Sequence, residues 1–522
     1  MTGIGERVST GIRNYNNEKK NNMITTTMRK KIIWMAALML ATTSAAADDY
    51  HMLYTVSMDT AKHYLNVNLT YTGEDEQLKL KMPVWAPGYY SILDFPKHLC
   101  DFSATDRKGE RLSWHKESKN TWVIDTKGKK TINVSYRIFA NERDVASSRV
   151  DANVAFIAPN GVFMYKDTDT SHPLTLTYDL PSNWKNISSG LKADTDNPHS
   201  FTVPSFDILF DSPFLIGNHY TKSFTHEGHD YEFAIETPQG LEESRFESSF
   251  RAIVSTCTDI IGDVPYDNYC LIHLGKGQGG LEHLNSQACY TDGTYEFHDE
   301  RSRWIKFLSF VAHEYFHLYN VKTIRPIELG PFDYDREAYC PLLWFCEGIT
   351  CYYETLILER AGLCTEEEKL LLLSNYMRMD ERYDGKYHQS LRMTSYDIWL
   401  NFMNEDANSK DVRINYYFRG PSVGLIMDIE IQRLSNNRHS LDDLMRLLYN
   451  RYYKEAGRGF TEEEFWNAVD EVAGASMSHV RDMVDKPGEI DYERYLTPAG
   501  IKLDREKWIM TLPKNEETFR GL

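Results

Sequence analysis

The stretch from Trp304 to Asn320 reads WIKFLSFVAHEYFHLYN. Apolar residues surround its polar centre and a proline follows shortly after it, so we predict a helix over 304–320. His313 and His317 are four positions apart and therefore share one face of that helix, where both can bind one metal ion. Glu314 can reach a water on that ion and take its proton. The alternative interpretation of the motif is a pair of buried core histidines with hydrogen-bond partners.

A catalytic metal site of this kind needs a third protein ligand. Thr323 stands where one class of zinc peptidases has a third histidine, so that arrangement is excluded. A second predicted helix spans Leu342 to Arg360. Its first part, as far as Tyr353, is apolar except for Glu347, and a buried carboxylate requires a cation. Glu347 is therefore the predicted third ligand, with an arginine ion pair as the alternative. Glu354 shares its helical face and is expected to be a backup ligand or a partner of a ligating histidine. Two histidines, one carboxylate and a water would form an open catalytic site for one zinc ion.

The first half of the chain has the alternating pattern of short β-strands separated by turns. The clearest runs are 64–71, 121–124, 131–136 and 174–178. From about residue 239 the pattern becomes helical, with further predicted helices over 421–434 and 440–453 and a capping box at Thr461 to Glu464. The predicted fold class is therefore a multidomain α+β protein. Its antiparallel β-domain spans 48–238 and its catalytic domain, with a largely helical C-terminal half, spans 239–500.

The N-terminus has the three parts of an export signal. Arg29 to Lys31 are basic, Ile32 to Leu40 are apolar, and Ala45 to Ala47 offer a small-residue cleavage site. We expect residues 1–47 to be an upstream extension and a cleavable signal peptide, and the mature chain to be periplasmic or extracellular without stable membrane insertion. The alternative is a buried N-terminal helix.

The formal charge of −18 becomes about −23 once the basic segment 1–47 is removed. So acidic a chain is a poor partner for nucleic acid. The eight cysteines include no C-x-x-C pair, which argues against a cysteine zinc site, and most are expected to be free and buried.

Together these motifs resemble the glycyl aminopeptidase family of gluzincin zinc peptidases, which is related to aminopeptidase N. The resemblance covers most of residues 50–500 and rests on five stretches: Met82–Tyr90, Gly279–His283, His313–Pro326, Leu343–Gly348 and Tyr416–Gly420. It implies a thermolysin-like catalytic domain after the β-domain. It also implies zinc held by His313, His317 and Glu347, with Glu314 as the base, and peptide substrates that lose an N-terminal residue, often glycine or alanine.

Two further stretches acquire roles through this resemblance. Gly279, Gly280, Glu282 and His283 match a segment that binds substrate in aminopeptidase N, where the glutamate holds the free amine. An edge strand with glycines also lets a peptide backbone approach closely. Tyr417 matches a tyrosine that hydrogen-bonds the oxyanion, although its neighbour Tyr416 is an open alternative.

One feature departs from the family pattern. Members commonly end in a PDZ domain, whereas residues 501–522 are expected to be only a short tail, with the PDZ domain either absent from this member or lost by truncation. The alternatives to an aminopeptidase are a gluzincin endopeptidase and an inactive exported binding protein with a structural zinc site.

Overall fold

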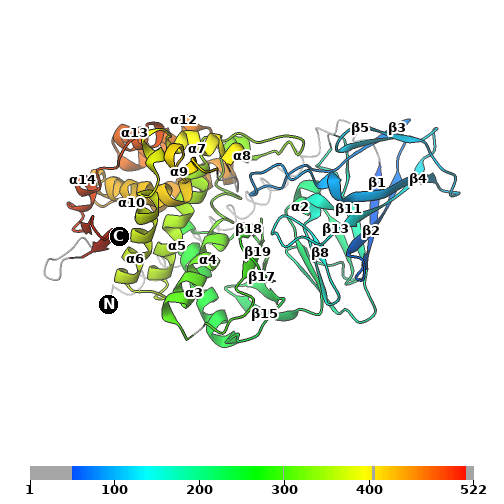
Figure 1. Ribbon diagram of the computed structural model, residues 1–522, viewed down its shortest axis with the longest axis horizontal. Coiled ribbons are helices and arrows are strands. Elements are labelled where there is room, and N and C mark those ends of the chain that lie inside the picture. Colours follow the sequence, from blue (N-terminus) through cyan, green and yellow to red (C-terminus); the bar gives the residue numbers. More distant parts are fainter. Residues whose placement is uncertain (1–49, 168, 298, 402–405, 513–522) are drawn as a thin grey trace, which may run out of the picture. The chain divides into compact units, whose positions relative to one another are not determined.

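The computed structural model describes residues 50–167, 169–297, 299–401 and 406–512, coloured in Figure 1. The predicted signal peptide lies outside these residues. Among the described helices, none is both long and apolar enough to cross a membrane.

Three β-sheets are built from the strands that precede residue 218. The first has the order β13 (Ser200–Val203), β11 (Leu174–Asp179), β1 (His51–Asp59), β2 (Tyr64–Thr72), β7 (Thr131–Phe139) and β4 (Leu99–Asp106). The second has the order β10 (Tyr165–Lys166), β3 (Gln77–Lys81), β6 (Thr121–Asp125) and β5 (Trp114–Ser118). The third has the order β12 (Asn186–Ser189), β14 (Phe214–Gly217), β9 (Val154–Ile157) and β8 (Arg149–Val150). The pairing is mostly antiparallel, as predicted, with β1 and β11 parallel.

Alternation of buried and exposed side chains explains why these segments are strands. In β2, Leu65, Val67 and Leu69 are buried while the residues between them are partly or fully exposed. This period of two places one apolar face toward the core. The four runs identified from the sequence are β2, β6, β7 and β11, and each prediction is confirmed to within a few residues.

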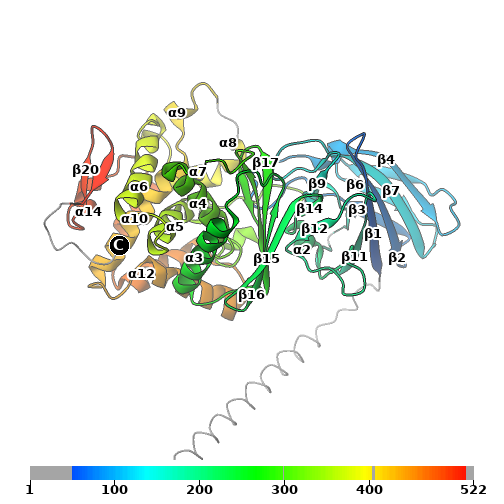
Figure 2. The ribbon, with the colours of Figure 1, turned by 90° about the horizontal axis from the view of Figure 1, so that it is seen from below.

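A fourth, five-stranded sheet carries the candidate site. Its order is β15 (Tyr220–His226), β16 (His229–Ile235), β17 (Asn268–Lys276), β19 (Ser286–Thr291) and β18 (Gly280–Glu282). Figure 2 shows α3 (Glu243–Ile261) and α4 (Arg301–Phe316) beside this sheet. Phe233 of β16 stacks on Phe246 of α3 with ring centroids 4.7 Å apart, so the sheet and helix share one core.

The chain after this sheet is helical. Its longer helices are α5 (Ile349–Arg360), α6 (Glu366–Asp380), α10 (Tyr416–Leu434), α11 (Leu441–Leu448), α12 (Glu462–Ala473) and α13 (Ser478–Asp485). Shorter ones are α7 (Leu391–Tyr396), α8 (Ile398–Asn401), α9 (Ser409–Val412) and α14 (Tyr492–Leu496), whereas the short helix α2 (Phe206–Phe210) lies earlier, between β13 and β14. Two π-helical segments, η4 (Trp344–Gly348) and η6 (Tyr449–Ala456), continue into or out of α-helices. The chain then forms a small hairpin of β20 (Lys502–Asp504) and β21 (Ile509–Thr511).

The predicted helices are present, with corrected ends. The helix predicted over 304–320 is α4, which ends at Phe316 and continues as turns. The helix predicted to begin near Pro421 begins at Tyr416 instead, because the Asn415 side chain accepts a hydrogen bond from the Tyr417 amide and caps the first turn. The capping box at Thr461 is confirmed. All eight cysteines are free, and all but Cys100 are buried.

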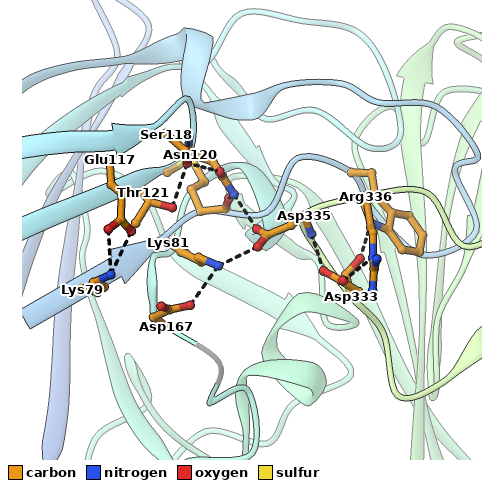
Figure 3. A network of polar contacts seen from close by, with 12 residues as sticks. Lys79, Lys81, Glu117, Ser118, Asn120, Thr121, Asp167, Asp333, Asp335 and Arg336 are labelled. Atoms are coloured by element: carbon orange, nitrogen blue, oxygen red, sulfur yellow. Dashed lines mark hydrogen bonds and ion pairs between the residues drawn. The ribbon is translucent and has the colours of Figure 1, made fainter.

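A polar network joins β3 and β6 to the loop that follows the candidate metal helix (Figure 3). The Lys81 ammonium lies 2.6 Å from Asp335 and 2.9 Å from Asp167. The Asn120 amide donates to Asp335 at 2.7 Å, and the Trp85 indole donates to the Asp333 carbonyl at 2.9 Å. The loop is thereby fixed against the β-sheets, although it lies more than 200 residues away in sequence.

Candidate active site

Helix α4 carries His313, and His317 is the helical residue that caps its C-terminus, so the two lie on one face as their spacing predicts. Both side chains are buried, and their Nε2 atoms lie 2.9 Å apart. The His313 Nδ1 atom is 2.8 Å from a carboxylate oxygen of Glu354, and the His317 Nδ1 atom is 2.7 Å from the Asn320 carbonyl oxygen. Each Nδ1 therefore has an acceptor, which leaves each Nε2 with a lone pair directed into the same space.

Glu354 and Asn320 orient the two rings. The Glu354 carboxylate also accepts hydrogen bonds from Ser309 at 2.9 Å and Tyr376 at 2.6 Å. It is therefore held as the partner of His313, which is the second of the two roles expected for it. The buried Asn320 amide donates to the carbonyls of Phe345 at 2.9 Å and Cys346 at 3.2 Å. This contact ties the end of α4 to the segment that carries Glu347.

Glu347 lies in the π-helical turn η4, immediately before α5. One of its carboxylate oxygens is 3.4 Å from His317 Nε2 and 3.8 Å from His313 Nε2. Burial opposes its ionisation, but the two imidazoles outweigh that effect and lower the pKa of Glu347. No arginine pairs with Glu347 among the described residues, so the alternative of an arginine ion pair is not what the structure has.

The donor set fits a metal ion. His313, His317 and Glu347 each offer one ligand atom, and these atoms all lie within 4.8 Å of one another. Two imidazole lone pairs 2.9 Å apart repel each other unless a proton or a cation lies between them. Two histidines and one carboxylate with an open fourth position are the ligand set of a catalytic zinc ion.

Glu314 lies beside this donor set and is buried. Burial, assisted by the nearby carboxylates of Glu282 and Glu347, raises the pKa of Glu314 to about 7, against the opposing effect of the two imidazoles. A carboxyl group with that pKa can both accept and return a proton near neutral pH. A Cβ atom at Gly280 would stand only 2.1 Å from Glu314 Oε1, so any larger residue where β18 passes over the carboxylate would displace it.

Strand β18 is the edge of the five-stranded sheet and carries Gly280 and Glu282. The Glu282 side chain is buried, and its Oε1 has no hydrogen-bond partner in the described part of the chain. Glu282, Glu314 and His317 offer atoms that all lie within 4.8 Å of one another. Gly88 of the β-rich half lies against Glu282, because a Cβ there would be 2.7 Å from Oε1.

Tyr417 reaches the site from the first turn of α10. Helix α10 approaches η4 closely at two glycines, since a Cβ on Gly420 would lie 2.5 Å from the Cα atom of Gly348. Burial and the nearby Glu347 carboxylate raise the pKa of the Tyr417 phenol well above its usual range, so the hydroxyl remains a donor. Tyr416 is fully buried and does not line the cavity described next.

The three candidate metal ligands, the candidate base, Glu282 and Tyr417 open into one cavity of about 710 Å³. Its walls include Gly279, Gly280, Glu282, His313, Glu314, His317, Glu347 and Tyr417. His283 is not among its lining residues. Instead, the His283 ring turns to Asp211, with Nδ1 3.0 Å from a carboxylate oxygen.

Several lining residues were not identified from the sequence. Tyr89, Asp144 and Val145 come from the β-rich half, and the Tyr89 hydroxyl donates to Asp144 at 2.8 Å. Cys351 Sγ lies 3.7 Å from His313 Nδ1. Helical spacing from Glu347 could have indicated Cys351, but no local pattern indicates residues that reach the site from loops of the β-rich half.

Comparison with solved structures shows the same fold elsewhere. An aminopeptidase N family protein from Idiomarina loihiensis is 26% identical, with a TM-score of 0.83 over 87% of this chain and 79% of that one. An M1 zinc metallopeptidase from Deinococcus radiodurans is 14% identical, with a TM-score of 0.53 over 85% of this chain and 94% of that one. A mutant of the latter, bound to a Tyr-Ser-Ala substrate, has the same TM-score at 15% identity, over 85% of this chain and 94% of that one. A search of curated proteins found no match.

Two family models match the sequence. Residues 53–218 match the peptidase M61 N-terminal domain, and residues 306–423 match the M61 glycyl aminopeptidase domain. The two ranges together cover just over half of the chain. The fold and these matches define a metallopeptidase. The chain belongs to the M61 glycyl aminopeptidase family, as its motifs predicted.

Proposed function

We propose that this chain is an exported zinc aminopeptidase that removes small N-terminal residues, such as glycine and alanine, from peptides. The observation that carries the proposal is the grouping of Glu282, Glu314 and His317 within 4.8 Å. It places a carboxylate suited to a peptide amine beside a candidate base and a candidate metal ligand. The family description of a glycyl aminopeptidase supports the small first residue.

His313, His317 and Glu347 would hold one zinc ion, with Glu354 and Asn320 orienting the histidines. Bound zinc supplies Lewis acidity toward the substrate carbonyl and toward water.

The remaining chemistry is assigned to side chains of the cavity. Glu314 takes a proton from the attacking water and returns it to the leaving amine. The Tyr417 hydroxyl donates a hydrogen bond to the oxyanion that develops on the substrate carbonyl. The surrounding burial strengthens both interactions, because charges interact more strongly where water is excluded.

The substrate backbone would lie along the edge strand β18, where Gly279 and Gly280 line the cavity. Glu282, which lines the cavity, would bind the free ammonium group through its carboxylate. This contact would restrict cleavage to the first peptide bond. Export rests on the sequence of residues 1–47, and the domain limits at 238 and 500 remain proposals.

Kinetics of Glu282 variants test the assignment. Wild-type protein should hydrolyse alanyl and glycyl amides and leave the matching N-acetyl compounds intact. Glu282→Ala should lower kcat/KM for the free-amine substrates by about 10- to 100-fold, as expected for a lost charged hydrogen bond. Glu282→Gln is the matched control for shape, and it should also lose most activity because the charge is gone.

The rival functions predict other results. An endopeptidase would cleave N-acetyl peptides and would tolerate Glu282→Ala. A binding protein would contain zinc and show no turnover of any peptide. Either result would overturn the proposed function.

A further inference from the structure

One wall of the active-site cavity follows a single face of α4. Lys306, Phe310 and His313 of this helix, and His317 at its C-terminal cap, all line the cavity. They are separated by four, three and four positions, which is the spacing of residues on one helical face. The wall therefore leads from the proposed zinc site to Lys306, an exposed cation nearer the start of the helix.

Lys306 is the only lysine or arginine among the described residues that line this cavity. The two arginines that precede it in α4 have carboxylate partners, since Arg301 lies 2.6 Å from Glu368 and Arg303 lies 2.9 Å from Asp292. Lys306, by contrast, forms no ion pair within 4.0 Å with any residue that the structure describes. Its ammonium group is therefore available to a carboxylate of a ligand.

The carboxylates that line the cavity are engaged elsewhere. Asp144 accepts from the Tyr89 hydroxyl at 2.8 Å, and Glu354 lies 2.8 Å from the His313 ring. The other three belong to the proposed zinc, proton-transfer and amine positions: Glu347, Glu314 and Glu282. Away from the proposed zinc position, Lys306 is thus the place in the described cavity wall that attracts a carboxylate of the substrate.

Contacts between β18 and α4 define the direction in which a bound peptide would extend. Glu282 offers an oxygen within 4.8 Å of ligand atoms of Glu314 and His317. A Cβ on Gly280 would lie 2.1 Å from Glu314 and 2.8 Å from Phe310, so the strand meets an earlier turn of α4 at its own earlier residue. A peptide whose amine binds Glu282 would therefore pass Gly280 and continue toward the start of α4.

The backbone of β18 is compatible with this path. The Gly279 carbonyl accepts from the Tyr290 amide at 3.0 Å, and the His283 amide donates to the first residue of β19 at 2.9 Å. Alternate residues of an antiparallel strand direct their N–H and C=O groups to opposite sides. Gly280 and Glu282 therefore direct theirs to the open edge of the sheet, where an extended peptide can pair with them.

The separation along the helix indicates how long such a peptide would be. Glu314 and Lys306 are eight positions apart in the sequence. Eight residues span roughly 12 Å along an α-helix. An extended peptide advances roughly 3.3 Å per residue, so three or four residues cover that separation.

We propose that the Lys306 ammonium binds the terminal carboxylate of a tripeptide or tetrapeptide whose amine is held by Glu282. The enzyme then binds short peptides by both ends and prefers them to peptides with a blocked carboxyl end. This inference rests on the proposed aminopeptidase function and specifies its substrate class.

The test compares kcat/KM for Ala-Ala-Ala and for its C-terminal amide. Wild-type protein should prefer the free acid by about 2- to 5-fold, the range expected for an ion pair with an exposed side chain. Lys306→Met removes the charge and should bring the acid-to-amide ratio to one or below, whereas Lys306→Arg should keep the preference. The ratio should also be close to one for a dipeptide and for a hexapeptide of alanine, because neither places its carboxylate at Lys306.

Arg303→Met is the matched control. Arg303 is an exposed cation on the same helix, but it pairs with Asp292 and does not line the cavity. The acid-to-amide ratio should therefore stay at the wild-type value in this variant. An equal loss of preference in Arg303→Met and Lys306→Met would overturn the proposal, because the general charge of the helix would then explain it.

A binding measurement separates this proposal from the aminopeptidase assignment. Calorimetric titration of Ala-Ala-Ala and its amide into the Glu314→Gln variant needs no turnover. Tighter binding of the acid, lost on adding Lys306→Met, supports the proposal even if no peptide is hydrolysed. Equal hydrolysis of acid and amide by wild-type protein would overturn it and leave the proposed function standing. A preference for the acid that survives in Lys306→Met would also overturn it.

Discussion

At the scale of single residues, the site depends on which atom each side chain leaves free. His313 and His317 use Nδ1 for internal contacts and so present Nε2, while Glu282 keeps one oxygen without a partner. The spacing of the two histidines predicts that they share a face, but it does not predict the partner of each Nδ1. Asn320 was missed for this reason, because its role depends on carbonyls of a segment 25 residues away.

Removing the hydroxyl group of Tyr416 or of Tyr417 tests which of the two donates to the oxyanion. Tyr417→Phe should lower kcat about 10²- to 10³-fold with little change in KM, because an oxyanion donor acts mainly in the transition state. Tyr416→Phe is the control, since Tyr416 does not line the cavity, and its kcat should stay close to that of wild type. A larger loss in Tyr416→Phe than in Tyr417→Phe would exchange the two roles.

At the scale of elements, strands and helices were predictable because each shows its own period in the sequence. The four strand runs and the capping box at Thr461 were found for that reason. The end of α4 was placed four residues too late, because the helix continues as a series of turns. The start of α10 was placed five residues too late, because the Asn415 cap decides it. The approach of β18 to α4 was expected only from family resemblance, since it depends on sheet order.

The close contact between β18 and α4 leads to a prediction for Gly280. Gly280→Ala would place a methyl group 2.1 Å from Glu314 Oε1 and so displace the carboxylate. We expect kcat/KM to fall about 100-fold, the cost of an ångström-scale misplacement of a catalytic group. Gly275→Ala on strand β17 of the same sheet is the control, because its Cβ would meet nothing closer than 3.3 Å. Equal activity of the two variants would mean that the base does not depend on this contact.

At the scale of the whole molecule, residues from the β-rich half complete the site. Gly88, Tyr89 and Asp144 line the active-site cavity, and Gly88 lies against Glu282. The sequence indicated a separate β-domain but could not indicate that its loops reach the catalytic cavity, because the contacts are long-range. The β-rich half is therefore part of the substrate-binding wall as well as a folding unit.

A buried ion pair also links the third and fourth sheets to each other. Arg149 of β8 lies 2.6 Å from Glu236, which follows β16, and the Arg149 side chain is 2% exposed. Arg149 also pairs with Asp151, so Glu236→Ala would leave the buried guanidinium with one of its two carboxylate partners. The change should reduce the free energy of unfolding by about 1–3 kcal/mol. The change would appear as a lower midpoint of urea unfolding.

Glu74→Ala is the control for that experiment. Glu74 pairs with Lys130 on the surface, where the two side chains are 77% and 72% exposed. Solvent screens such a pair, so its removal should leave the midpoint unchanged. Equal midpoints for the Glu74 and Glu236 variants would refute a structural role for the Arg149 pair.

The central claim is that the two histidines and Glu347 hold zinc while Glu314 moves the proton. Its most direct test is zinc content and alanyl-amide turnover, measured together on purified Glu314→Gln. The variant should keep the zinc content of wild type, because Glu314 is not one of the three proposed ligands. Its kcat should fall about 10²- to 10⁴-fold, the usual contribution of a positioned proton-transfer group. A zinc-loaded variant that turns over at the wild-type rate would contradict the account.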